Sequence, residues 1–547
     1  MSLWQESAFD AMTAIGHRID RERGGQPYFW TDLISKPPQL KHQSWDYCDM
    51  SGRWIDALIR GRLMTGSSLH LEDEEILKKF MLSRAGEDGL FYNEAKPEYG
   101  STYAADMFCQ SRVFLGLNTW FQNSGSNVVE GHLVRLSNRL ANVAQWEGKY
   151  AWFPGSEWRD DRWLDADGTI AKFDPKVASA LKAPGYRTTL LGGLVEYAEL
   201  LDDKEAKRLA LGLALNYIDR SGAIAPDGSY VGHTHSGGVL PTVLGVLRCG
   251  IALGDENLIN WARKVYDFTI TQISSFGWLA DGIGFASDYF WGDFCETCGL
   301  ADFIEIGILL TENKIGDYWN VVERCARNQL LENQIKDVKG LFNGPVSENL
   351  VAATIGSFAC CALPNSYLGW DQGLEGCCIG SGIRAIYLFW RHGVKDDGQK
   401  LIINVPISRE TEIAHVYSDD PFVGLLRIVM RRSGSVDLRK PFGNSGPIRI
   451  TVNSKESSNL GEGEWFYLTG LAAGDEIIMK YGLPESKEKT VIAGKSYDLS
   501  WRGRTVMEIN PPGKICLTYQ RSNYLQSNKS KPDKVFAAEH REKLLPW

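Results

Sequence analysis

The sequence lacks several features that would place it in a common class of protein. Its 547 residues contain no dense basic run, and Lys and Arg are scattered through a chain of net charge -9. Nucleic-acid binding is therefore not expected. No uninterrupted apolar run approaches the ~20 residues of a membrane span. The start, MSLWQESAFDAM, has no basic segment followed by an apolar one, so we expect neither a membrane partner nor a secretory signal.

The cysteines also lack the pattern of a secreted protein. Their number, 11, is odd, and their spacings do not indicate a disulfide framework. Together with the start of the chain, this predicts a reducing, cytoplasmic location. The sequence contains no short repeat of the kind that would indicate a solenoid. The sequence does not determine the oligomeric state and is compatible with a homo-oligomer.

Helical periodicity dominates the chain up to about residue 395. About a dozen segments of similar length are joined by long aromatic connections rich in Gly, Asp and Pro. Paired helices with long loops gathered at one end favour a closed toroid of helices around an active-site funnel. The predicted helices lie near 4–23, 44–63, 72–84, 101–121, 128–146, 186–201, 203–219, 235–253, 256–274, 297–312, 316–334 and 378–391.

Alternating runs typical of strands follow a polar, Gly-containing stretch at 392–400. Several short strands separated by turn residues indicate a β-sandwich. We therefore predict an α + β multidomain protein. Its domains are a helical domain at 1–395, a β-sandwich at 396–525 and a polar tail at 526–547.

Three thiols and one carboxylate stand at the starts of two apolar helical runs. Glu296 and Cys298 precede the first run, and Cys377 and Cys378 open the second. Residues two apart point to different faces inside a helix, so convergence on one ion requires backbone that is not yet helical. Three sulfurs and one oxygen would suit tetrahedral Zn²⁺. Ordinary buried cysteines and a redox pair are the alternatives.

Two histidines and several carboxylates could serve the same site. His233 and His235 lie in the Gly-flanked segment YVGHTHSGG, ahead of a predicted helix. Substrate contact by at least one is the functional interpretation, against metal ligation or an ordinary satisfied polar group. Asp281 and Asp288 precede Glu296 closely, and a glycosidase would need a proton donor near its nucleophile.

These motifs resemble those of glycoside hydrolase family 127, the β-L-arabinofuranosidases with a cysteine nucleophile. The resemblance rests on CETC at 295–298, the CC pair at 377–378, GHTH at 232–235 and an early helix with Trp45, Asp49 and Trp54. It covers nearly the whole chain, because a helical domain precedes a β-rich one. It implies an (α/α)6 helical barrel followed by a C-terminal β-sandwich.

The resemblance also implies roles for individual residues. Zn²⁺ would be bound by Glu296, Cys298, Cys377 and Cys378, with Cys377 as the nucleophile. His235 matches the sugar-binding histidine of the family, and His233 is the near alternative. Trp45 and Asp288 are the further candidate substrate contacts.

The chain departs from the family at three places, one of which is a sugar-binding histidine of the family that is replaced near Tyr186. The family has two prolines and an asparagine after the CC pair, where this chain has Ile379, Gly380 and Ser381. The family's general acid is a Glu about sixteen residues before the zinc-binding Glu, and that position falls here near Asp281. We expect Asp281 to protonate the leaving oxygen, with Asp288 next in line.

The resulting prediction is a retaining glycoside hydrolase that cleaves a furanoside, such as one of L-arabinose, through a zinc-bound cysteine. The alternative is a non-catalytic carbohydrate-binding relative that retains a structural zinc. A toroid lyase acting on uronic acid polymers is a third interpretation. Its Tyr/His base and Arg clamp have no clear counterpart in this sequence.

Overall fold

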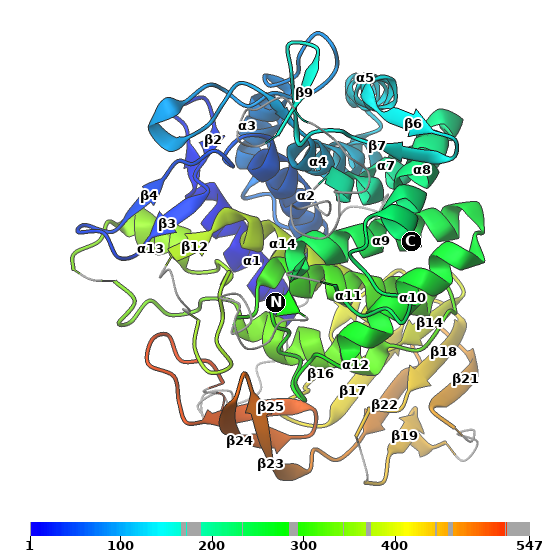
Figure 1. The fold of residues 1–547 in the computed structure, drawn as a ribbon. Coiled ribbons are helices and arrows are strands. Elements are labelled where there is room, and N and C mark those ends of the chain that lie inside the picture. Colours follow the sequence, from blue (N-terminus) through cyan, green and yellow to red (C-terminus); the bar gives the residue numbers. More distant parts are fainter. Residues whose placement is uncertain are drawn as a thin grey trace.

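The computed structural model describes residues 2–165, 171, 187–231, 234–283, 294–342, 344–367, 373–443, 446–457, 463–519 and 521. Helices dominate the first part of the chain, and strands dominate the part after residue 393 (Figure 1). This order agrees with the predicted succession of a helical and a β-rich region.

Six helices pack in a closed ring, because each contacts the next in chain order and the last contacts the first. Nearly every described residue of these helices is buried in the second half of the ring, as expected of helices that are apolar on most sides. Glycines permit the closest approach: a Cβ at Gly52 would overlap the backbone of the neighbouring helix at Arg112. The ring consists of α2 (Cys48–Thr65), α4 (Met107–Ser124), α7 (Leu190–Leu200), α9 (Ser236–Leu253), α11 (Thr297–Glu312) and α14 (Gly376–Gly393).

A second set of helices covers the outside of the ring and alternates with the inner set along the chain. The outer helices α5 and α10 bury one stripe of apolar residues and leave the opposite face exposed, the pattern of surface helices. The outer elements are α1 (Leu3–Gly16), α3 (Leu71–Leu82), α5 (Asn127–Val143), α8 (Lys204–Arg220), α10 (Glu256–Ile270) and α12 (Trp319–Arg324) with its π-helical continuation η3 (Cys325–Leu330). Two short helices are η1 (Pro97–Tyr99) and α13 (Glu348–Thr354), which packs on α1.

Three predicted helices differ from the structure. The segment predicted near 101–121 becomes helical only at Met107, after the short strand β5 (Ala105–Asp106). The helix predicted near 4–23 ends at Gly16. The chain after it forms a short strand pair, β1 (Ile19–Asp20) with β2 (Gln26–Pro27). The segment predicted near 316–334 changes from α to π geometry at Cys325. Periodicity alone does not distinguish these features from a continuous helix.

The axis of the ring is closed by buried ion pairs. Glu305 on α11 accepts hydrogen bonds from Arg384 on α14, at 2.8 Å to each oxygen, and another from Arg248 on α9. Arg248 also contacts Glu196 on α7 at 3.3 Å, and Arg384 contacts Asp56 on α2 at 3.3 Å. Burial opposes ionisation of Glu305, but the two arginines lower its pKa to about 2. The network therefore joins five of the six ring helices.

One ring helix, α9, is long and apolar enough to cross a membrane by length and composition. Its most apolar window is 83% buried within the fold. A core helix of this kind passes the same test as a membrane span, and the packing of α9 against α7, α10 and α11 accounts for its composition.

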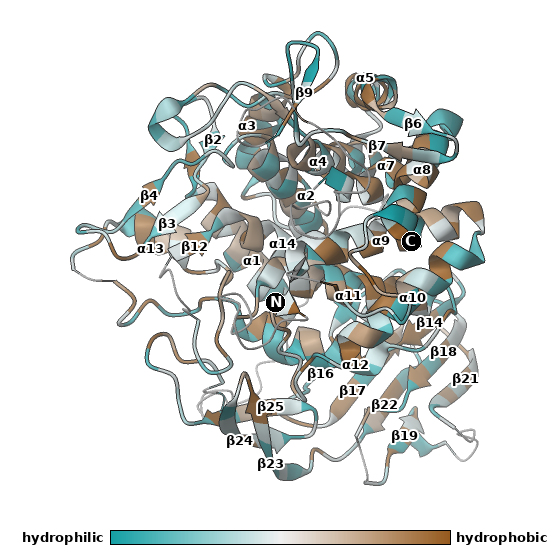
Figure 2. Ribbon diagram, viewed as in Figure 1, coloured by the Kyte–Doolittle hydropathy of each residue, from teal (hydrophilic) through white to brown (hydrophobic). Residues whose placement is uncertain are grey.

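The β-rich region contains three sheets. Buried residues alternate with more exposed ones along β17, where Leu426, Ile428 and Met430 are buried, and the strands of this region carry both hydrophobic and hydrophilic residues (Figure 2). The four-stranded sheet has the order β13 (Val394–Asp396), β14 (Lys400–Ile403), β18 (Gly434–Arg439) and β21 (Trp465–Leu471). The six-stranded sheet has the order β15 (Arg409–Glu410), β16 (Ala414–Ser418), β17 (Leu425–Met430), β22 (Glu476–Lys480), β19 (Arg449–Val452) and β20 (Lys455–Glu456). The third sheet is β23 (Glu485–Ile492), β24 (Lys495–Arg502) and β25 (Thr505–Asn510).

The stretch predicted as a linker at 392–400 is structured. It contains the end of α14 at Gly393 and the whole of β13. Helix and strand therefore follow each other directly, and the division of the chain at 395/396 stays a prediction.

Short strands in the loops fix the starts of the ring helices. β12 (Gly373–Glu375), directly before α14, pairs with β3 (Trp30–Asp32), which also pairs with β4 (Gln39–Lys41). β10 (Thr234–His235), directly before α9, pairs with β11 (Gly282–Ile283). The remaining pairs are β5 (Ala105–Asp106) with β8 (Glu157–Arg159), β8 with β9 (Arg162–Leu164), and β6 (Gln145–Glu147) with β7 (Tyr150–Trp152).

Candidate metal and active site

The starts of three neighbouring ring helices meet at one place. His235, Glu296 and Glu375 are the residues directly before α9, α11 and α14, and each has extended backbone. Local contacts hold these starts: Phe29 accepts a backbone hydrogen bond from Gly376, whose own carbonyl accepts from the indole of Trp54. Helix N-termini present unpaired N–H groups and favour negative charge.

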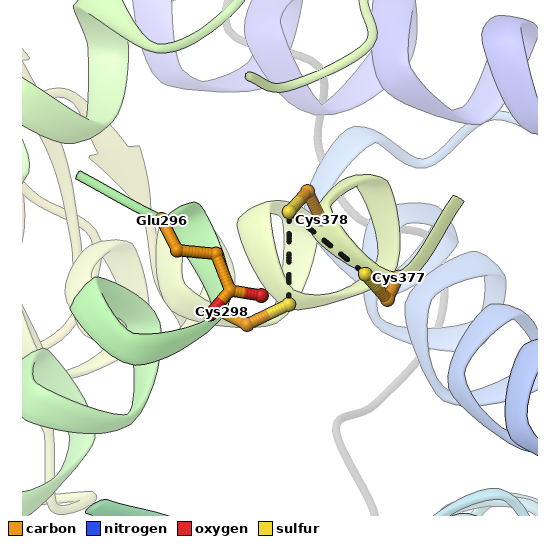
Figure 3. A group of neighbouring side chains, drawn as sticks. All are labelled: Glu296, Cys298, Cys377 and Cys378. Carbon is orange, nitrogen blue, oxygen red and sulfur yellow. Dashed lines mark hydrogen bonds between the residues drawn. The ribbon is translucent and has the colours of Figure 1, made fainter. Parts of the chain in front are cut away.

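Four side chains converge at the starts of α11 and α14 (Figure 3). The Sγ atom of Cys298 lies 3.7 Å from Sγ of Cys378, which lies 3.9 Å from Sγ of Cys377. Donor atoms of these cysteines and of Glu296 all lie within 4.8 Å of one another, and all four residues are buried. Glu296 and Cys298 converge because Glu296 precedes the helix, as the sequence analysis required.

The environment of the cluster favours one thiolate at Cys298. Ser381 donates a hydrogen bond to its Sγ at 3.3 Å, and Nη1 of Arg53 lies 3.9 Å away while donating to Ser381 at 3.0 Å. Hydrogen bonds from the thiols of Cys377 and Cys378 lower the pKa of Cys298 well below its usual range.

The other two thiols have raised pKa values. The Cys298 thiolate raises the pKa of Cys377, and burial raises that of Cys378. Cys377 also donates a hydrogen bond to Oε2 of Glu375 at 3.3 Å. Glu375 is thus in position to accept the proton that Cys377 must lose before it can act as a ligand or nucleophile.

His235 and Asp281 adjoin the cluster. Pairing of β10 with β11 brings them together: Nε2 of His235 lies 3.4 Å from Oδ2 of Asp281 and 3.2 Å from Oε2 of Glu296. Ser236 donates to the other oxygen of Asp281 at 2.6 Å, and Asp281 is only 2% exposed. Burial opposes a charge on His235, but the two carboxylates raise its pKa to about 10.

Glu296 has an oxygen that the described residues leave without a hydrogen bond. Its Oε2 is buried and accepts no hydrogen bond of regular geometry, although Nε2 of His235 lies 3.2 Å away. Burial raises the pKa of Glu296 well above its usual range. A buried acceptor beside three sulfurs is a donor set that could hold a metal ion.

A narrow pocket lies on the ring axis directly below the cluster. It encloses about 50 Å³, several times the ~10–15 Å³ that one water molecule needs. Its wall continues from the cluster, because Arg53 and Ser381 line the pocket and also contact Cys298. Arg112 and Asp302 face it from α4 and α11.

Trp45 connects the surface with this pocket. It is 37% exposed and packs edge-on against Phe108, with ring centroids 5.7 Å apart. The guanidinium groups of Arg112 and Arg53 lie over the same Phe108 ring, at 4.7 and 5.6 Å from its centroid. Trp45 thus lies at the outer end of an aromatic and cationic wall.

The structure brings most of the sequence-predicted residues into one place. Glu296, Cys298, Cys377 and Cys378 form the cluster, and Asp281 and His235 adjoin it. His233 and Asp288 lie outside the described residues.

Sequence reasoning missed three contributors to the site: Arg53, Ser381 and Glu375. Glu375 carried a signal, since the segment GLEGCC puts a carboxylate two residues before Cys377. Ser381 lies three residues after Cys378, about one helical turn, and so on the same side of α14. Arg53 is distant in the sequence and carried no comparable signal.

Comparison with solved structures gives the fold a precedent. No protein-family model matches this sequence, and no curated protein matches it. A GH127 β-L-arabinofuranosidase from Geobacillus stearothermophilus T6 superposes with a TM-score of 0.60 over 92% of this chain and 80% of its own, at 14% identity. A GH127 β-arabinofuranosidase, BT3674, gives 0.62 over the same shares, at 11% identity. A third structure, a glycoside hydrolase, gives 0.58 over 84% and 77%, at 12% identity. The chain therefore resembles the GH127 enzymes in fold and is far from them in sequence.

Proposed function

We propose that this protein is a retaining glycoside hydrolase of the β-L-arabinofuranosidase type, which cleaves a furanoside through a zinc-bound cysteine. The observation that carries the proposal is the cluster of one carboxylate and three thiols at the mouth of a helical ring whose fold resembles GH127 enzymes. In this proposal the two sets of helices are the layers of an (α/α)6 barrel, and the strands after residue 393 form a β-sandwich.

Zinc fits the donor set in chemistry and spacing. Tetrahedral Zn²⁺ with Zn–S bonds of about 2.3 Å places its sulfurs about 3.8 Å apart. The two sulfur pairs that Cys378 forms are 3.7 and 3.9 Å apart. Oxygen from Glu296 would complete four ligands and would give its buried Oε2 a partner. When bound, the ion keeps its cysteine ligands ionised.

Cys377 is the proposed nucleophile. Its Sγ attacks the anomeric carbon, a C–S bond forms, and the bond from that carbon to the leaving oxygen breaks. Water then attacks the same carbon and gives its proton to the carboxylate of Asp281, the C–S bond breaks, and two inversions give net retention. Glu375, which accepts a hydrogen bond from the Cys377 thiol, can take the proton that this thiol releases.

Asp281 is the proposed proton donor for the leaving oxygen. It adjoins the cluster and contacts His235, whose side chain is 28% exposed and therefore more accessible than Asp281. His235 and Trp45 are the proposed substrate contacts, one beside the metal cluster and the other at the outer end of the Phe108 wall. The roles proposed for His233 and Asp288 rest on the sequence alone.

One observation favours the alternative function, a non-catalytic carbohydrate-binding protein with a structural zinc. Asp281 is nearly inaccessible, and its two oxygens already face Ser236 and His235. A donor held in this way must be released, or must act through His235, before it can protonate a substrate. Activity on an unactivated glycoside distinguishes the two functions.

The proposed location is the cytoplasm. None of the eleven cysteines, all of which belong to the described residues, is in a disulfide, as expected of a reducing compartment. A homo-oligomeric state stays a prediction.

The decisive experiment assays zinc-loaded protein against a panel of aryl furanosides and one unactivated β-L-arabinofuranoside, with the product anomer followed by NMR. Hydrolysis with retention supports the proposal. Inversion refutes the mechanism, and sugar binding without any hydrolysis supports the alternative. Cys377→Ala, checked for zinc content and folding, serves as the inactive control.

A further inference from the structure

Two charged side chains at the pocket below the cysteines are only incompletely paired within the protein. Arg112 is 9% exposed, and its Nε has no hydrogen bond. Its nearest ionic contact among the described residues is Asp49, at 3.8 Å. Asp302, which lines the same pocket from α11 and is partly exposed, makes no hydrogen bond and no ion pair with any residue that the structure describes. Arg112 is buried, and a buried polar group usually has closer partners than this.

The other charges around the pocket are already compensated. Arg53 donates to Asp49 at 2.7 Å. Below it, the buried network of Glu305, Arg384 and Arg248 closes the ring axis. Arg112 and Asp302 are therefore the pair of opposite charges left to meet a ligand from above.

The physical state of both groups agrees with this interpretation. Burial and the neighbouring Arg53 lower the pKa of Arg112 to about 10. Burial raises the pKa of Asp302 to about 7, although Arg112 opposes that shift. Each charge is thus incompletely stabilised by the protein, as expected of groups that a ligand completes.

The size of the pocket limits what can enter it. About 50 Å³ accommodates a few water molecules or the hydroxyl groups of a sugar. The sugar ring itself would then lie above, at the level of the cysteines. Arg248 and Arg384 of the ion-pair network also line this pocket, so a sugar chain would have to displace that network to go deeper.

We propose that Arg112 and Asp302 bind the hydroxyl groups of one uncharged, terminal sugar unit and so determine the specificity of the site. This inference rests on the proposed function for the identity of the ligand as a sugar. A hydroxyl group both donates and accepts, so a pair of hydroxyls satisfies Asp302 as acceptor and Arg112 as donor. The carboxylate of a uronic acid could pair with Arg112, but it offers no donor to Asp302 and is repelled by that carboxylate, so it satisfies only one of the two groups.

The test is direct binding, which does not depend on turnover. The zinc-loaded protein is titrated by calorimetry with 1,4-anhydro-L-arabinitol, a furanose ring without an anomeric oxygen to cleave. A second titration uses the same ring with a carboxylate in place of its hydroxymethyl group. L-Arabinose, D-galactose and D-galacturonate form a second set. At least one uncharged sugar should bind at least tenfold more tightly than its acidic counterpart.

Variants identify the residues responsible. Arg112→Gln and Asp302→Asn should each weaken binding about 10- to 100-fold, since each removes a hydrogen bond to a charged group. Arg112→Lys keeps the charge, and it should still weaken binding because it loses the planar fork. The exposed changes Arg208→Gln and Asp498→Asn are the matched controls. Zinc content and thermal unfolding report whether each variant is folded.

The outcomes separate this inference from the proposed function. Preferred binding of the acidic sugar overturns the inference, as does unchanged binding by folded variants or no binding of any sugar. Hydrolysis that is insensitive to both variants overturns the inference and leaves the hydrolase proposal intact. Sugar binding that depends on Arg112 and Asp302, without hydrolysis of any glycoside, supports the inference and refutes the hydrolase.

Discussion

Replacing Glu305 by Gln should destabilise the helical ring by about 3 kcal/mol. Gln preserves the size of the side chain but removes the charge that faces Arg384 and Arg248. Arg384 and Arg248 lower the pKa of Glu305 from 4.5 to about 2, and each tenfold change in an acid constant is worth about 1.4 kcal/mol. Breaking a buried ion pair in other proteins costs a similar ~3–5 kcal/mol.

The assay is urea unfolding at pH 7, followed by tryptophan fluorescence. Glu205→Gln is the matched control, because Glu205 pairs with Arg208 at 3.0 Å on the exposed face of α8. Exposed pairs contribute little to stability, so this variant should unfold at nearly the wild-type urea concentration. The Glu305→Gln midpoint should lie clearly lower.

The pH dependence gives a second measurement of the same interaction. The folded pKa of Glu305 lies below its unfolded value, so its stabilising contribution is complete above about pH 4.5 and is lost as the pH falls towards 2. The wild type should therefore lose more stability than Glu305→Gln over that interval. A variant within about 0.5 kcal/mol of wild type at pH 7 would refute the reasoning that the ion-pair network is held by this charge.

Four further predictions concern the site. Cys298→Ala should lose zinc, measured by native mass spectrometry with elemental analysis, and should unfold at lower temperature because the ion joins α11 to α14; a variant that retains one zinc per chain contradicts the ligand set. A haloacetamide-bearing furanoside should label Cys377, as seen by peptide mass mapping, and full turnover by Cys377→Ser would exclude it as the nucleophile. Asp281→Ala should lower the rate on an unactivated glycoside by about 10²–10⁴, with least effect on good leaving groups, and undiminished activity on that glycoside contradicts the assignment. Asp302 has a folded pKa of about 7, above the usual 3.8, so it destabilises the fold as the pH rises between these values; the thermal-unfolding advantage of Asp302→Asn over wild type should grow across that interval, and a constant difference would count against the raised pKa.

Local sequence patterns were sufficient to predict the elements that carry the site. The apolar runs after Glu296 and after Cys378 predicted helices near 297–312 and 378–391, and α11 and α14 span Thr297–Glu312 and Gly376–Gly393. The spacing of apolar residues is sufficient to predict these helices, because a helix that is apolar on most sides is stable only inside a core. The same patterns put the candidate ligands at helix starts.

Distances between remote segments were decided by the tertiary structure. Eighty residues separate Cys298 from Cys378, and only the packing of α11 against α14 brings their sulfurs within 3.7 Å. Asp281 reaches His235 because β10 pairs with β11. No local pattern specifies such pairings, since they follow from closure of the whole ring.

The charged interior of the ring is the clearest case of what the sequence by itself could not reveal. Glu305 and Arg384 lie in helices whose periodicity predicts burial, but a sequence pattern does not indicate which buried charges will meet. Arg112 and Asp302 look equally ordinary in the sequence, and only their positions at the pocket distinguish them from the paired charges below. Residue type and the spacing of apolar residues determined the helices and the kind of site. The closure of the ring decided which charges have a partner of opposite charge and which are left for a ligand. Such pairing depends on distances of a few ångströms between separate helices, which the sequence does not specify.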